Sequence, residues 1–515
     1  MCDLILFNAN VISMDPLRPG AELIAIRGDR IASVGGNGML GELKRPGTHS
    51  IDCKDKTILP GFVDAHCHVF AYGESLVSPN LSKRESVHSI LDIQRKIGDF
   101  CNSVPPGTWV RAKAFDESTV SEERFLNRWD LDSVAPSHPV KITHRSGHAH
   151  ILNSLALARV GITEETGDPP EGLIDRDSQT GKPTGILYGM GSYLAEKIPF
   201  LDEAELMRGL EQANKNLLSF GITSLQDASS ANDRDRWRRF LTLKSREILQ
   251  PRLTIMMGFE GLRESQREPF RSHLDSIDLR LGGVKVIVDQ VTGSLNPSQQ
   301  ELDGKISAIN EAELQAVIHA VETPEIEAAF SAIDRALKKN PRPDHRHRIE
   351  HCSVCPPPLL RKLAGLGVTI VTQPSFVYYS GDRYLKTVPA DQMEDLYAIG
   401  SMLSHGLSIG FGSDFPISDP NPLAGVGAAV TRLTEEDRRV QPKQGISLAD
   451  ALKAYTIGAA TAAFEENIKG SVTPGKVADL TVLNENPFSV PPDRVKDIRV
   501  TMTMIGGKIV WENVS

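Results

Sequence analysis

The stretch Ile58-Leu59-Pro60-Gly61-Phe62-Val63-Asp64-Ala65-His66-Cys67-His68 decides the fold prediction. It is an apolar run that ends in two histidines separated by one residue, which is typical of a buried strand that reaches a metal site. Residues i and i+2 of a β-strand point to the same side, so His66 and His68 can offer imidazole nitrogens to one metal ion, while Cys67 faces away. Two histidines near a strand end also occur by chance as surface or core residues, and the pair alone does not exclude this.

Four further residues extend the pair to a candidate metal site. His319, His351 and Asp414 each lie in or just after a short apolar stretch. Lys285 interrupts a strand-like run that is otherwise apolar through residue 288, and a buried lysine is costly unless it is paired, modified or metal-bound. In a (β/α)₈ barrel the C-terminal ends of all strands open onto one mouth, where ligands hundreds of residues apart converge. A barrel is therefore the economical explanation of the spacing.

Hydrophobic periodicity gives the fold class. Short apolar or alternating strands separated by Gly, Asp and Pro turns occupy the start of the chain and return after residue 463. Between them, apolar strands alternate with longer helical stretches, which indicates β/α units around a parallel sheet. We predict an α/β fold with a (β/α)₈ TIM-type barrel over residues 58–463. Residues 1–57 and 464–515 are predicted to form one small discontinuous β-sandwich domain.

An insertion into the barrel is predicted at about residues 70–140, after the first strand. It contains Trp109, Phe115 and Trp129. We expect it to roof the mouth of the barrel and to supply an apolar substrate pocket.

Composition narrows the class of partner. With 515 residues, 40% of them hydrophobic and 24% charged, the chain has the composition of an ordinary globular protein. Its net charge of −9 comes from 57 basic and 66 acidic residues. The densest basic stretch, residues 234–239, is read as a solvated helix face. We therefore expect a small-molecule substrate and no nucleic-acid partner.

The cysteines and the N-terminus favour a cytoplasmic location. The N-terminus has no basic leader and no small-residue cleavage site. No apolar run reaches the roughly 18 residues that a membrane span needs, so no membrane partner is expected. The cysteines, at positions 2, 53, 67, 101, 352 and 355, lack the spacing of a disulfide framework. Cys352 and Cys355 form a CxxC, which by itself is weak evidence for redox or zinc chemistry.

Three segments carry a family resemblance. Residues 59–68 resemble the first-strand motif of the amidohydrolase superfamily. Residues 147–154 (Gly-His-Ala-His-Ile-Leu-Asn-Ser) are similar to a segment of the branch of metal-dependent hydrolases that includes N-substituted formamide deformylases. Residues 470–480 are similar to the return of that family into its β domain. The resemblance covers nearly the whole chain.

The resemblance implies a binuclear metal site, usually with zinc, in which a carbamylated lysine bridges the two metals. The implied ligands are His66, His68 and Asp414 for the more buried metal, His319 and His351 for the more exposed one, and Lys285 for both. Mn²⁺ or Fe²⁺ would also suit this N/O shell, and two dications can bring the pKa of bound water towards about 7. Asp414 would accept the proton as the resulting hydroxide attacks, and would pass it to the leaving nitrogen.

His148 is the catalytic candidate that is not a metal ligand. In the branch that the chain resembles, the Gly-His segment reaches the pocket, so His148 is expected to hydrogen-bond the substrate. The alternative is a structural histidine that caps a turn.

Two departures from the family pattern surround His319. Residues 310–318 run into this histidine with no Gly or Pro between helix and strand. Either the helix is unusually short or residues are missing, which would distort this side of the barrel. Glu322 completes an HxxE that resembles the mononuclear deaminase branch, where a glutamate shuttles protons. Its alternative role is that of an acid at the start of a helix, favoured by the helix dipole.

We therefore predict an amidohydrolase that cleaves a C–N bond of a small organic amide, an N-substituted amide or formamide, by metal-activated hydroxide. A deaminase of a ring amidine is the second candidate, favoured by Glu322 and opposed by Lys285. A catalytically silent barrel with a defective metal site is the third. The sequence leaves open the substrate, the identity and number of the metals, and whether the chain forms a homo-oligomer.

Overall fold

The computed structural model describes residues 2–169, 172–199, 201–262, 276–291 and 294–513. Its contacts divide the chain into two compact units. Met1–Val69 and Asn214–Ser515 form the first, and Phe70–Ala213 form the second.

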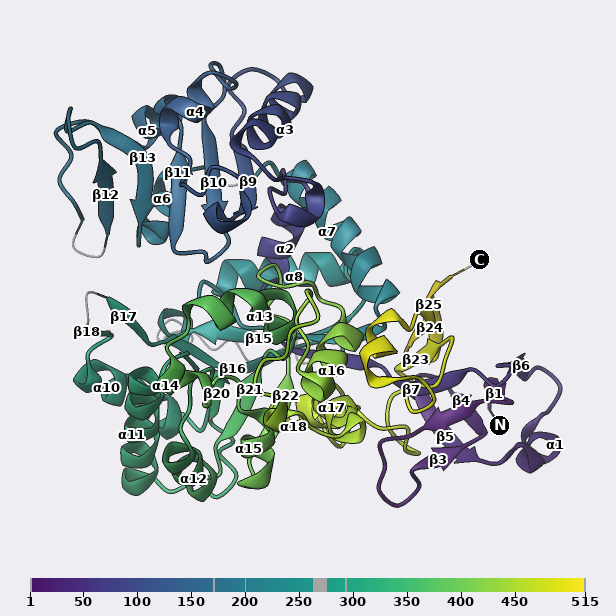
Figure 1. Ribbon diagram of the computed structural model, residues 1–515. Coiled ribbons are helices and arrows are strands. Elements are labelled where there is room, and N and C mark those ends of the chain that lie inside the picture. The colour runs from purple at the N-terminus through teal and green to yellow at the C-terminus, as the bar shows by residue number, and fades with distance from the viewer. Residues whose placement is uncertain (1, 170–171, 200, 263–275, 292–293, 514–515) are drawn as a thin grey trace. The chain divides into compact units, whose positions relative to one another are not determined.

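A barrel of parallel strands dominates the first unit (Figure 1). In sheet order the strands are β8 (Phe62–Cys67), β14 (Ile222–Asp227), β15 (Arg252–Gly258), β16 (Leu279–Ile287), β19 (Ala316–Ala320), β20 (Arg348–His351), β21 (Thr369–Thr372) and β22 (Ser408–Phe411). Every neighbouring pair in this order is parallel. Strands β8, β14, β15, β20 and β21 are buried at every position, because helices cover one face and facing strands the other. The predicted barrel is confirmed.

The barrel closes where the first histidines lie. The backbone N–H of Asp414 donates to the carbonyl of His66 at 2.8 Å, and the N–H of His68 donates to the carbonyl of Phe415 at 3.0 Å. A Cβ atom at Gly412 would lie 2.5 Å from the backbone nitrogen of His66. The absence of a side chain at this glycine therefore lets β22 approach β8 closely enough to bring the two ends of the sheet together.

Helices follow the barrel strands. In chain order from residue 203 they are α7 (Glu203–Ser219), α8 (Arg234–Ser245), α10 (Gln299–Glu311), α11 (Thr323–Lys339), α12 (Pro357–Leu366), α13 (Ser375–Thr387), α14 (Ala390–Met393), α15 (Ile399–Ser404), α16 (Pro422–Thr431), α17 (Leu448–Ala454) and α18 (Ile457–Ala462). Local sequence explains the starts of those beside the site. Ser298 and Glu301 form a capping box at α10, and Pro324 lies in the first turn of α11, where its missing N–H costs nothing.

Both chain ends contribute to a small β-sandwich in the first unit. One sheet has the order β25 (Lys508–Glu512), β24 (Val500–Ile505), β23 (Leu480–Leu483), β7 (Thr57–Pro60), β2 (Asn10–Ile12), β3 (Gly20–Ala21). The other has the order β5 (Arg30–Gly35), β4 (Leu23–Arg27), β1 (Leu4–Phe7), β6 (His49–Asp52). β7 pairs with β23 across more than 400 residues of sequence, and Leu6, Ile24, Leu480 and Met504 share one apolar core. The predicted discontinuous sandwich is confirmed.

The second unit is a five-stranded sheet with helices. Its strand order is β12 (Leu173–Arg176), β13 (Pro183–Tyr188), β11 (Ala149–Leu152), β10 (Val140–His144), β9 (Val110–Phe115). Its helices are α2 (Val69–Leu76), α3 (Ile90–Ser103), α4 (Arg128–Asp132), α5 (Ser154–Val160) and α6 (Gly191–Lys197). Ile151 and Leu152 belong to different apolar clusters, as adjacent strand residues facing opposite sides should.

The unit Phe70–Ala213 is longer than the insertion predicted at about 70–140. Two aromatic residues expected to line a substrate pocket have another role. Phe115 is fully buried and Trp109 is nearly so, and each belongs to an apolar core of this unit. Trp129 is 44% exposed. The domain boundaries at 57/58 and 463/464 stay predictions. None of the helices in the described ranges is long and apolar enough to cross a membrane.

Candidate metal centre

His66 and His68 both approach Asp414 at the C-terminal mouth of the barrel. His66 ends up almost fully buried in β8, and His68 follows the strand with 27% of its side chain exposed. The Nε2 atoms of the two rings lie 3.5 Å and 3.0 Å from Asp414 Oδ1. The Nδ1 atoms have partners of their own, Glu350 Oε2 for His66 and Ser229 Oγ, at 3.0 Å, for His68. Both Nε2 atoms therefore face Asp414 at the mouth.

His351 reaches the same point through an unusual backbone at the end of β20. Its φ is +71°, and the N–H of Cys352 donates to the carbonyl of Glu350 at 3.0 Å. This tight turn costs free energy because non-glycine residues rarely adopt positive φ, and such strain is common at functional sites. His351 Nδ1 lies 2.8 Å from Gln373 Oε1. Since an amide oxygen only accepts, Nδ1 carries the proton and Nε2 is free to bind a metal.

Asp414 is the third member of the group. It follows β22 with a φ of +59°. One ligand atom each from His66, His351 and Asp414 lies within 4.8 Å of the others, and all three residues are buried. Three convergent ligand atoms at the mouth of a barrel are the minimum that a catalytic divalent metal needs.

Lys285 lies on β16 and interacts electrostatically with Asp414 and His66. It is 3% exposed, and its Nζ has no hydrogen-bond partner among the described residues. Burial lowers the pKa of its ammonium group to about 8. An amine with this pKa is partly neutral near neutral pH, which makes it a better nucleophile and ligand than an ordinary lysine.

His319 lies on β19 with its ring 4.4 Å, centroid to centroid, from the ring of His351. Of the two alternatives left open for the segment before His319, the distorted barrel is not what the structure has, because β19 is paired on both sides. α10 ends at Glu311, and Glu313 provides the turn into β19 by adopting a φ of +58°, so neither Gly nor Pro is needed. β19 then pairs in regular parallel register with β16 and β20, with Ile287 opposite His319.

Three histidines of the centre, His66, His319 and His351, have lowered pKa values, which favours the neutral imidazole. Burial is the largest cause in each case, and the neighbouring Lys285 adds to it. The pKa values of His66 and His319 lie well below the ordinary value, and that of His351 is also lowered. Neutral imidazoles have a lone pair to offer, as metal ligation requires.

Asp414 is a carboxylate. Burial opposes its ionisation, but the hydrogen bond from His68 and the nearby His66 and His351 outweigh burial and lower the pKa of the carboxyl group. The centre therefore offers neutral imidazole nitrogens, one carboxylate and one unpartnered amine, and this donor set fits Zn²⁺, Mn²⁺ or Fe²⁺.

His148 is placed in the other compact unit, in the exposed turn between β10 and β11. Its backbone N–H donates to Ser146 Oγ at 3.2 Å. The contact of His148 with substrate stays a prediction.

Two motifs with alternative interpretations have structural positions that explain them. Glu322 is the N-cap of α11, and its backbone N–H donates to Glu325 Oε2 at 3.0 Å, so it occupies a helix start as the second interpretation expected. Cys352 and Cys355 are both fully buried. The hydrogen bond with Cys355, together with burial, raises the pKa of the Cys352 thiol well above its ordinary value, which disfavours the thiolate that redox chemistry uses.

Sequence reasoning missed the buried acids that support the site, Asp64 and Glu350. Asp64 lies within the quoted stretch 58–68, and Glu350 directly precedes His351; a charge in an apolar strand needs a partner at either position. Glu350 is paired with Arg348, which is also fully buried. An acid or an arginine inside an otherwise apolar barrel strand was the available signal.

Two of the cavities lined by described residues lie at opposite ends of β15 and β16. One of about 600 Å³ is lined by Lys285 together with Phe259, Asp289, Pro297 and Lys305. It therefore adjoins the candidate centre and has room for a small organic molecule.

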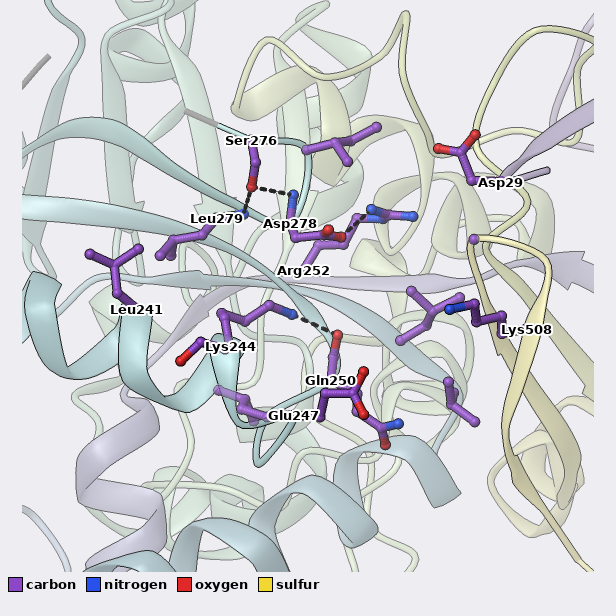
Figure 2. A pocket seen from close by; sticks show the side chains of 16 residues that line it. Asp29, Leu241, Lys244, Glu247, Gln250, Arg252, Ser276, Asp278, Leu279 and Lys508 are labelled. Atoms are coloured by element: carbon purple, nitrogen blue, oxygen red, sulfur yellow. Dashed lines mark hydrogen bonds and ion pairs between the residues drawn. The ribbon is translucent and has the colours of Figure 1, made fainter. Parts of the chain in front are cut away.

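The other cavity, of about 580 Å³, lies at the opposite end of β15 and β16 (Figure 2). Its cations already have partners. Arg252 pairs with Asp278 at 2.5 Å, and Lys244 Nζ donates to the carbonyl of Gln250 at 2.8 Å. Barrel enzymes place their chemistry at the C-terminal ends of the strands, so the cavity beside Lys285 is the better candidate for substrate.

Comparison with known proteins agrees with this geometry. A family model described as "Amidohydrolase family" matches residues 49–511. The N-substituted formamide deformylase of Arthrobacter pascens is 27% identical over 540 residues, which cover 99% of each chain. Protein LONG AFTER FAR-RED 3 of Arabidopsis thaliana is 27% identical over 545 residues, 99% of this chain and 92% of that one.

A solved structure shares the fold. It is that of an uncharacterized metal-dependent hydrolase from Pyrococcus furiosus, with a TM-score of 0.73 and 22% identity. The match covers 94% of this chain and 100% of the other.

Proposed function

Since the chain belongs to the amidohydrolase family and is a hydrolase of C–N bonds other than peptide bonds, we propose that it cleaves N-substituted amides or formamides with two divalent metal ions. We expect these ions to be zinc, with Mn²⁺ or Fe²⁺ as the alternatives. The observation that carries the proposal is the convergence of His66, His351 and Asp414 to within 4.8 Å beside the unpartnered amine of Lys285. The relative whose name includes formamide deformylase matches over 99% of both chains, which supports this substrate class.

The chain's own residues divide the work of the site. His66, His68 and Asp414 would hold one metal, and His319 and His351 the other. Lys285 would bridge both as a carbamate, which its buried and partly neutral amine can form with carbon dioxide. Bound divalent metals supply Lewis acidity, which polarises the substrate carbonyl and lowers the pKa of water.

Asp414 moves the proton in this scheme. Its carboxylate, fixed beside the Nε2 atoms of His66 and His68, accepts the proton of the attacking water and returns it to the leaving nitrogen. The amide is thereby converted to a carboxylic acid and an amine, with one water consumed. The cavity beside Lys285 would hold the substituent on nitrogen.

A metal and activity measurement tests the proposal. The purified protein should contain about two equivalents of metal and should release formate from N-alkyl or N-aryl formamides. His66→Ala and Asp414→Ala should lose activity by about three orders of magnitude or more while keeping the circular dichroism of the wild type. His405→Ala is the control, because its ring bonds only the carbonyl of Ser401 among described residues, outside the centre.

Other outcomes identify the other candidates. One equivalent of metal together with deamination of a ring amidine would favour the deaminase. In that case Glu322 would shuttle protons, and Lys285 would have no role as a bridging ligand. A well-folded protein that binds no metal would favour the silent barrel. The cytoplasmic location and homo-oligomer formation stay predictions.

A further inference from the structure

A buried ion pair lies inside the barrel beneath the candidate metal centre. Arg348 and Glu350 are both 0% exposed. They are joined by two parallel hydrogen bonds, Nε to Oε1 at 2.8 Å and Nη2 to Oε2 at 2.9 Å. Charges this deep are costly unless every polar atom has a partner, so the surroundings of the pair indicate why it is there.

The arginine is anchored on its other sides. Its Nη1 donates to Gln226 Oε1 at 2.5 Å, and its Nη2 also donates to the carbonyl of Ala65 at 2.8 Å. Gln226 in turn donates to the carbonyl of Ala459 at 2.7 Å. Three barrel strands and α18 therefore fix the guanidinium, and the guanidinium fixes both oxygens of Glu350.

The fixed glutamate in turn bonds His66, a ligand of the proposed centre. Its Oε2 faces His66 Nδ1 in a short hydrogen bond. A carboxylate only accepts, so His66 Nδ1 carries the proton of this hydrogen bond, and Nε2 is the ring nitrogen left to bind a metal. That Nε2 is the atom that lies 3.5 Å from Asp414 Oδ1.

Glu350 does not belong to the ligand set itself. Both its oxygens are taken by Arg348, and the group of convergent ligand atoms comprises His66, His351 and Asp414 without it. Lys285, the nearby cation that could compete for Glu350, has no hydrogen bond to it. The carboxylate is thus committed to Arg348 and His66.

We propose that Glu350, held by Arg348, is a positioning residue that sets the tautomer and the orientation of His66, so that its Nε2 is ready for metal before metal binds. The inference rests on the proposed function, because it assigns the metal-binding atom of His66. Partners that orient a ligating histidine in this way are worth about 10- to 100-fold in metal affinity.

Stability and metal affinity must be separated in the test, because removal of one member of a buried ion pair destabilises a fold. Two changes do this. Glu350→Asp keeps the charge beside Arg348 but shortens the side chain by one methylene, so it cannot reach His66. The double variant Arg348→Met/Glu350→Leu replaces the pair with apolar groups of similar volume, which folds usually tolerate.

The readouts are the zinc dissociation constant, from competition with a chromophoric chelator, and the thermal midpoint of the metal-free protein. Both variants should bind zinc about 10- to 100-fold more weakly than the wild type, and the double variant should keep a midpoint close to the wild-type value. Binding within about twofold of the wild type in whichever variant folds would overturn the positioning role.

Glu465→Gln is the matched control. Glu465 forms another buried ion pair, with Lys469 at 2.9 Å and exposures of 2% and 4%, but it does not contact the centre in the described structure. This change should lower the thermal midpoint and leave zinc affinity unaltered. A merely structural role for Glu350 would give the same pattern as this control.

His66→Ala separates the inference from the proposed function. If it binds zinc as the wild type does, the proposed site is wrong. If His66→Ala loses zinc while the Glu350 variants do not, the proposed metal site is supported and the positioning role of Glu350 is contradicted.

The wild-type protein offers a measurement that needs no variant to fold. In metal-free protein labelled with ¹⁵N-histidine, His66 should show a protonated Nδ1 with a strongly downfield proton. A His66 ring protonated at Nε2 instead would contradict the assignment.

Discussion

Ser413 Oγ donates a hydrogen bond of 2.6 Å to Asp64 Oδ2, and this bond ties the end of β22 to β8. Asp64 Oδ1 also accepts from the backbone N–H of Ser413 at 3.0 Å. The aspartate is 1% exposed, and burial raises the pKa of its carboxyl group to about 7. Because Ser413 precedes Asp414, this contact holds the carboxylate of the candidate centre near His66 on β8.

Gly412→Ala should disturb that closure. The added Cβ would lie 2.5 Å from the backbone nitrogen and 2.8 Å from the Cβ of His66. Overpacking of this kind costs about 1–3 kcal/mol, and the strands can relieve it only by moving apart, which separates His66 from Asp414. We expect a lower thermal midpoint and weaker zinc binding, measured by melting and by chelator competition.

Gly365→Ala is the control for this prediction. Gly365 lies in α12, and a Cβ there would meet no atom within 4 Å. Alanine in a helix is favoured over glycine by about 0.5–1 kcal/mol, so this variant should melt slightly higher and bind zinc normally. Equal effects from the two glycine changes would refute the role of the closure.

Lys285→Ala should lose metal. Its amine is the buried bridge of the proposed centre and has no other described partner. We expect fewer than two equivalents in the purified variant and partial recovery of metal and activity when a short carboxylic acid such as propionate is added, since a carboxylate can replace the carbamate oxygens. Lys305→Ala, in the adjoining cavity, should keep its full metal content. Unchanged metal in Lys285→Ala would rule out the bridge.

His319→Ala should remove one metal and leave the other. His319 contacts the ring of His351 but lies outside the group formed by His66, His351 and Asp414. Metal analysis of the variant should give about one equivalent, and its activity should fall as the second metal is lost. His347→Ala is the matched control, because His347 is fully buried and its Nδ1 accepts from the N–H of Ala316. It should cost stability and leave two equivalents bound.

Stability should rise with pH through the titration of Lys244. Burial lowers the pKa of this lysine from its ordinary 10.5 to about 8. The unfolded chain therefore binds more protons than the folded one between these values, and stability increases with pH across that window. The thermal midpoint of the wild type should rise relative to that of Lys244→Met between pH 8 and pH 10. A constant difference between the two midpoints would contradict the lowered pKa of Lys244.

Much of the fold could be predicted because its signals are local. Apolar strands that alternate with helical stretches indicate a parallel barrel, and the return of short strands after residue 463 predicts the discontinuous sandwich. The sequence left the form of the segment before His319 open, also for a local reason. Glu313 adopts a positive φ that sequence statistics reserve for glycine, so the link between helix and strand had no visible signal.

The candidate ligands are partly local and partly not. His66 and His68 were found from one strand motif, whereas Trp109 and Phe115 were expected at a pocket and lie in the core of their own unit. An aromatic residue contributes the same hydrophobicity to a core and to a pocket. Sequence pattern does not distinguish the two.

The sequence by itself determined the barrel, the sandwich and the residue types that a metal site requires, because strand periodicity and family motifs involve residues close together in the sequence. Only the tertiary structure decided which buried charges support them. Glu350 lies 284 residues from His66, and Ser413 lies 349 residues from Asp64. Such contacts depend on which strands become neighbours or face one another across the closed barrel. They also depend on backbone turns such as that of His351, which has a locally unfavourable positive φ and whose Nδ1 bonds Gln373 Oε1.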